Sequence, residues 1–105
     1  MSCPAVEETP GPTAVGPDGK ITALGDPAAV TGGALSLAVV RAELARIVAA
    51  RRARDPHLHY LDGRELLGPD EAHDLADGLH PTAAAYRRMG KRFATHAFAN
   101  DSPFH

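Results

Sequence analysis

The chain has 105 residues, a formal charge of -2, 44% hydrophobic residues and only 5% aromatic ones. This length allows at most one small domain, and the near-neutral charge gives no reason to expect nucleic acid or an anionic membrane as a partner. Cys3 is the single cysteine, no apolar run approaches the roughly 18 residues of a membrane span, and the N-terminus lacks a signal peptide, so we expect a cytoplasmic protein without disulfides.

Residues 1–33 form a segment rich in proline and glycine, which we expect to be a loop. Its prolines remove backbone donors and its glycines favour turns over periodic structure. The stretch GPDGK, residues 16–20, is typical of a turn. Val15 and Ile21 flank this turn, and their positions predict a short hairpin there.

Residues 34–105 contain the remaining predicted elements, and the first is a helix that Ser36 caps. The apolar residues that follow recur at steps of three and four, which predicts an amphipathic helix; they are Leu37, Val40, Leu44, Ile47 and Val48. Arginines occupy the last turn, where they complement the negative end of the helix dipole. Pro56 then ends the helix.

Residues 57–62, HLHYLD, predict a strand, because the run is short and is bounded by Pro56 and Gly63. Residues 64–79 are expected to form a loop with one helical turn at RELL, residues 64–67. The last helix is predicted from Thr82 or Ala83 to about Ala99. A helix, a strand, a loop and a second helix in this order correspond to half of an α/β layer structure.

Asp77 and His80 stand three residues apart, directly before Pro81 and the last helix. The residue before a proline is held in extended geometry, so His80 stays outside the helix, near its positive end. Gly78 allows the chain to turn, so that the Asp77 carboxylate accepts a hydrogen bond from one ring nitrogen of His80. The other nitrogen then faces outward as a general base, which is the arrangement of a hydrolytic triad.

The stretch LHYLDGRELLGPDEAHDLADGLHPTAAAYRRMGKRF, residues 58–93, resembles the C-terminal portion of the SGNH/GDSL hydrolases, whose last sequence block is Asp-x-x-His-Pro. SCPAVEETPGPT, residues 2–13, resembles the proline-rich segment that follows a central strand in some bacterial members. The resemblance implies the C-terminal part of a three-layer α/β/α sandwich of flavodoxin type and ester hydrolysis by a serine nucleophile. It also implies that His80 is the general base and Asp77 its orienting carboxylate.

The chain departs from this family at the nucleophile. The Gly-Asp-Ser block and the Gly-x-Asn-Asp block of the family are absent; GDP at 25–27 and FAND at 98–101 match them only by chance. The three serines do not resemble an activated nucleophile, because Ser2 is terminal, Ser36 caps a helix and Ser102 lies in a tail. We therefore expect a truncated hydrolase, beginning where the second half of the enzyme would begin.

The sequence also contains residues suited to two other kinds of site. One is a divalent metal site on nitrogen and oxygen ligands, although their spacing matches no common zinc pattern; these residues are Asp70, His73, Asp74, Asp77 and His80. The other is a phosphate-binding surface on the basic pairs of the two helices; these residues are Arg51, Arg52, Arg87, Arg88, Lys91 and Arg92. Solvated helix faces and a surface turn are commoner, so we expect no metal and no cofactor.

Two functional hypotheses follow. In the first, the chain is part of an ester hydrolase that takes its ester substrate only when the missing half completes it. In the second, it is a non-catalytic module that associates with itself or with a chain supplying that half. A lone strand leaves both edges unpaired, so we expect a molten, aggregation-prone monomer or an oligomer that completes its sheet across an interface.

Overall fold

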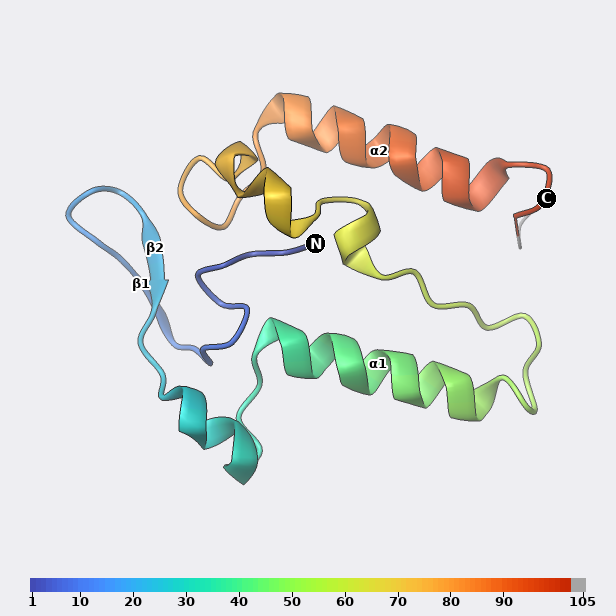
Figure 1. Ribbon diagram of the computed structural model, residues 1–105, viewed down its shortest axis with the longest axis horizontal. Coiled ribbons are helices and arrows are strands. Elements are labelled where there is room, and N and C mark those ends of the chain that lie inside the picture. Colours follow the sequence, from blue (N-terminus) through green and yellow to red (C-terminus); the bar gives the residue numbers. More distant parts are fainter. Residues whose placement is uncertain (103–105) are drawn as a thin grey trace.

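The structure is a computed structural model that describes residues 1–102. It contains one small antiparallel sheet, two long helices and three short 3-10 helices (Figure 1). In chain order these elements are β1 (Thr13–Val15), β2 (Ile21–Ala23), η1 (Pro27–Gly32), α1 (Leu37–Arg51), η2 (Gly63–Glu65), η3 (Pro69–Asp74) and α2 (Ala83–Phe98). The described chain is therefore a small α/β domain.

The hairpin predicted around GPDGK is confirmed. Strands β1 and β2 pair antiparallel, with Val15 opposite Ile21. The turn closes through a hydrogen bond of 2.8 Å from the Gly16 N–H to the Lys20 carbonyl. Gly19 has a φ of 76°, which only glycine adopts readily, so the turn depends on its sequence.

Both predicted helices are confirmed, and each begins at a hydroxyl cap, but α1 ends at Arg51, before the chain reaches Pro56. The Ser36 hydroxyl accepts a hydrogen bond of 3.3 Å from the Val39 N–H at the start of α1. At the start of α2, the Thr82 hydroxyl accepts a hydrogen bond of 3.2 Å from the Ala85 N–H. No helix within residues 1–102 is both long and apolar enough to cross a membrane.

The strand predicted over residues 57–62 is wrong. This segment has a turn at His57 and no regular structure over residues 58–62. It pairs with no strand in the described part of the chain, where β1 and β2 pair only with each other. Tyr60 lies against α1 and donates its hydroxyl to the Arg41 carbonyl at 3.3 Å. A strand exists only with a neighbour, and local sequence does not reveal whether one is present.

The molecule is flat, with principal extents of 47 × 36 × 17 Å. Helices α1 and α2 run in the same direction at opposite edges of this plate, and the N-terminal segment and residues 52–75 lie between them (Figure 1). A three-layer sandwich contains two spacings of about 10 Å between layers and is deeper than this. Residues 1–102 do not form three layers.

The hydrophobic core is small. Four buried residues make one cluster: Cys3, Leu67, Leu75 and Ala85. By contrast, α1 has no buried residue, and Leu44 and Ile47 of its predicted apolar face are 48% and 39% exposed. The helices therefore carry more apolar surface than the rest of the described chain covers.

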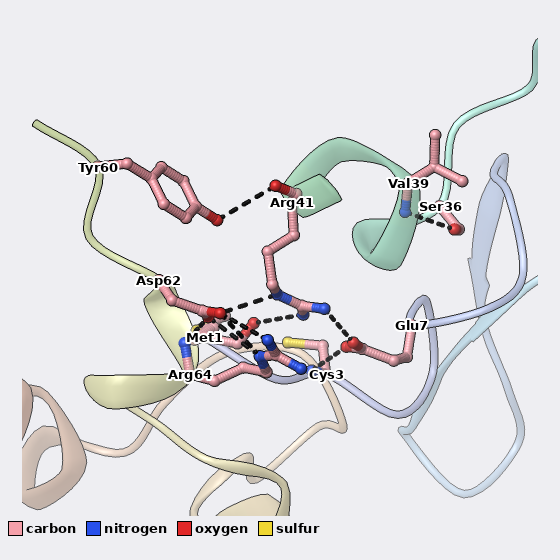
Figure 2. A network of polar contacts seen from close by, with 9 residues as sticks. All are labelled: Met1, Cys3, Glu7, Ser36, Val39, Arg41, Tyr60, Asp62 and Arg64. Atoms are coloured by element: carbon pink, nitrogen blue, oxygen red, sulfur yellow. Dashed lines mark hydrogen bonds and ion pairs between the residues drawn. The ribbon is translucent and has the colours of Figure 1, made fainter. Parts of the chain in front are cut away.

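Helix α1 is joined to the N-terminal segment by backbone hydrogen bonds at its first turn, from Leu37 to Val6 and from Ala38 to Glu7, and by ion pairs. The Arg41 guanidinium lies 2.6 Å from Glu7 and 3.6 Å from Asp62, and it donates to the Met1 carbonyl at 3.5 Å (Figure 2). Arg64 binds the same Asp62 carboxylate at 2.6 Å. Because the Arg41 side chain is only 12% exposed, these ion pairs are better shielded from water than ordinary surface pairs.

Candidate functional site

The candidate site is the turn from Asp77 to His80. One oxygen of Asp77 accepts hydrogen bonds from the backbone N–H groups of Leu79 and His80, at 2.9 and 2.7 Å. The other oxygen lies 2.6 Å from Nδ1 of the His80 ring. The contact expected from the spacing of these two residues is therefore present.

The backbone N–H of His80, the His80 ring and the backbone N–H of Leu79 together hold the pKa of Asp77 well below its usual range. Asp77 is thus a carboxylate at neutral pH and can only accept, so the proton it shares with His80 is on Nδ1. The His80 side chain is 65% exposed. Its Nε2 has no partner within residues 1–102 and, when the ring is neutral, can take up a proton.

The backbone around the turn is shaped by Gly78 and Pro81. Gly78 has a φ of 86°, a conformation that side chains with a Cβ rarely adopt. Leu75 forms an isolated bridge with Pro81, and the Thr82 N–H donates to the Asp74 carbonyl at 2.8 Å. The turn is therefore closed at its base, directly before α2 begins.

Distant segments also hold the turn, and sequence reasoning missed them. The Ile21 N–H donates to the Asp77 carbonyl at 2.7 Å, and Lys20 Nζ donates to the Ala76 carbonyl at 2.7 Å. The buried Cys3 thiol, whose pKa is raised by burial, lies 3.6 Å from the Leu79 carbonyl. These contacts span 56 residues or more, and a single sequence carries no signal for them.

Helix α2 is joined to the segment before the turn by an ion-pair cluster. Arg88 binds Glu71 at 3.0 Å and also binds Asp74, and Arg92 binds Glu71 at 2.6 Å. The hydrogen bonds from Arg92 and from the Gly68 N–H lower the pKa of Glu71 to about 2. Two of the arginines proposed for a phosphate surface are therefore occupied by carboxylates.

Replacing Glu71 with Gln is expected to reduce the loss of unfolding free energy between pH 6 and pH 3. The folded state holds the Glu71 pKa below its unfolded value of 4.5, so its contribution is present above that pH and is lost as the pH falls toward 2. Urea unfolding at pH 6 and pH 3 measures this difference, which should shrink in Glu71→Gln. Glu8→Gln is the matched control, because Glu8 is exposed and has no ion pair in the described chain; an equal change in both variants would contradict the role of Glu71.

Replacing Asp77 with Asn is expected to move the proton of the neutral His80 ring from Nδ1 to Nε2. The Asn oxygen can still accept from the two backbone N–H groups, but its NH₂ group now faces Nδ1 and must donate to it. Two-bond ¹H–¹⁵N spectra at pH 9, where imidazole rings are neutral, distinguish the two tautomers. Asp70→Asn should leave the His80 spectrum unchanged, and an unchanged tautomer in Asp77→Asn would show that the carboxylate does not set it.

The other candidate groups are not brought together into a site. No cluster of three or more His, Cys, Asp or Glu side chains suited to a metal is found within residues 1–102. The Ser36 hydroxyl caps α1, Ser102 donates to the Ala97 carbonyl and Ser2 is buried. In the described chain, none of them is hydrogen-bonded to His80.

Comparisons of the chain with protein-family models, with curated proteins and with solved structures found no match.

Proposed function

We propose that this chain is the C-terminal portion of an SGNH/GDSL-type ester hydrolase, in which His80 is the general base and Asp77 orients it. The observation that supports this most is the contact of 2.6 Å between Asp77 and Nδ1, with Nε2 of an exposed ring left open. The Asp-x-x-His-Pro block before the final helix supports the same proposal. In this proposal, helices α1 and α2 cover a larger sheet of a three-layer sandwich.

In the proposed reaction, Nε2 of His80 removes the proton from a serine hydroxyl as that oxygen attacks the ester carbonyl. The imidazolium that forms is stabilised by the Asp77 carboxylate, which stays ionised. His80 then donates the proton to the leaving alcohol, and it activates water for hydrolysis of the acyl-enzyme in the same way. The serine and the donors for the oxyanion come from a segment outside these 105 residues.

The test is to express residues 1–105 joined to the polypeptide encoded upstream of Met1 and to measure hydrolysis of p-nitrophenyl esters. We expect a Gly-Asp-Ser block in the upstream reading frame and esterase activity in the joined protein. His80→Ala should lower kcat by about 10⁶-fold, and Asp77→Ala by about 10⁴-fold. Activity unaffected by His80→Ala, or an upstream frame without a nucleophile block, would contradict the proposal.

A non-catalytic module that associates with itself or with a complementing chain is the second candidate. It is favoured by the exposed apolar side chains of α1 and α2, which include Leu44, Ile47, Tyr86 and Phe93. Light scattering combined with the esterase assay separates the two candidates. An associating module forms a defined complex that does not hydrolyse esters, whereas the hydrolase portion gains activity when it is joined to the upstream polypeptide.

A further inference from the structure

Helix α2 directs Arg88 and Arg92 toward the rest of the chain and leaves its aromatic residues exposed. Arg88 and Arg92 bind Glu71 and Asp74, as described above. Tyr86 and Phe93, seven residues apart and so on one side of the helix, are 55% and 46% exposed. An amphipathic helix normally buries its apolar side, so this orientation leaves an apolar surface to be covered.

Gly90 lies between the two aromatic residues on the same side of α2. A Cβ added at Gly90 would meet nothing within 4 Å, so packing within the chain does not require a glycine there. Glycine in the middle of a helix is destabilising relative to alanine, and close approach of another backbone is a common reason for it. Ala83 and Ala94 are exposed beside it. We call Tyr86, Gly90, Phe93 and these two alanines the outer face of α2.

The accessible area shows how much surface remains to be covered. The chain exposes 6962 Å², whereas a compact monomer of 11.0 kDa exposes roughly 5,600 Å². The excess is about 1,400 Å², and each partner of a permanent homodimer buries about 1,000 Å² or more. One interface of that class would remove the excess.

The charges beside the outer face argue against a membrane as the occupant. Helix α2 contains no acidic residue, but Arg88 and Arg92 are already paired. Only Arg87 and Lys91 of α2 are exposed cations without an ion pair in the described chain. Segments that bind anionic lipids carry clusters of about 4–8 basic residues.

We propose that a second copy of this chain docks on the outer face of α2 across a two-fold axis. In such an interface the same surface is used by both copies, so each aromatic pair packs on the small residues of the other copy. Gly90 lets the two helices approach closely. This proposal does not depend on the esterase proposal, since it concerns only the isolated chain.

The test is sedimentation velocity of the full chain between 5 and 500 µM, at 0.05 and 0.5 M NaCl. We expect a species of twice 11.0 kDa that dissociates on dilution. Because Arg87 and Lys91 of both copies lie near the interface, high salt should leave the dimer unchanged or tighten it. A monomer throughout this range overturns the proposal, and so does a monomer that instead sediments with phosphatidylserine vesicles.

Variants locate the interface. Tyr86→Ser combined with Phe93→Ser should raise the dimer dissociation constant at least tenfold and leave helix content unchanged, since both side chains are exposed. Leu35→Ser is the matched control, because Leu35 is 61% exposed and lies outside α2, and it should leave the dimer intact.

Two further variants test whether the helices approach closely and which helix forms the interface. Gly90→Leu adds apolar surface but blocks close approach, so it should also weaken the dimer, whereas it would strengthen a merely adhesive surface. Leu44→Ser on α1 should have no effect. A dimer lost in Leu44→Ser but retained in the Tyr86 and Phe93 variant would place the interface on α1 and overturn the proposal.

Discussion

The isolated 105-residue chain is expected to hydrolyse p-nitrophenyl esters no faster than the same chain after denaturation. Removing the nucleophile from a serine triad lowers turnover by about 10⁶-fold, and removing an oxyanion donor lowers it by about 10²–10³-fold. In the proposed mechanism, His80 and Asp77 supply only a base and its orienting group. They provide no serine to activate and no donors for the charge that develops on the ester oxygen.

Stopped-flow release of p-nitrophenol measures this activity. The denatured chain is a matched control, since it retains all 6 histidines and their intrinsic reactivity toward activated esters. A burst of p-nitrophenol from the native chain that His80→Ala abolishes would contradict the expected result, and would require a nucleophile within the 105 residues.

Replacing Leu67 with Ala is expected to lower the free energy of unfolding by about 2–5 kcal/mol. Leu67 is fully buried in the cluster with Cys3, Leu75 and Ala85, and its backbone carbonyl accepts from the Ser2 N–H at 2.8 Å. With so few buried residues, the surrounding chain has little apolar material with which to fill the cavity. The midpoint of thermal unfolding should fall by about 10 °C or more.

Circular dichroism during heating, at one fixed protein concentration, measures this change. Leu35→Ala is the control, because Leu35 is 61% exposed, and its free energy of unfolding should change by less than about 0.5 kcal/mol. Equal midpoints for Leu67→Ala and Leu35→Ala would show that the cluster around Leu67 does not determine stability.

The sequence predicts those features whose causes lie within a few residues. Ser36 and Thr82 cap their helices through the N–H group three residues later, and the hairpin depends on the turn between Val15 and Ile21. The contact between Asp77 and His80 is equally local. Each of these is decided by neighbours along the chain, so spacing and residue type suffice.

Features that depend on distant partners are not predicted. Residues 57–62 have the composition of a strand but find no strand to pair with in the described chain. The arginine at position 88 reads as a solvated cation, whereas it binds Glu71, 17 residues away. Helical periodicity shows which side chains share a face, but not which face the rest of the chain contacts. In α2, the side that carries Arg88 and Arg92 contacts the chain.

The hydrogen bond from Ile21 to the Asp77 carbonyl also bears on how the site assembles during folding. The contact between Asp77 and His80 needs only four residues and can form early, as fast as other short turns do. Its attachment to the hairpin joins residues 56 positions apart, and the attachment through Cys3 joins residues 76 positions apart. Closing such long loops carries a larger entropic penalty, so these attachments form late and contribute little to the folding nucleus. The pair of Asp77 and His80 is therefore expected to form as a local turn before the fold fixes its position.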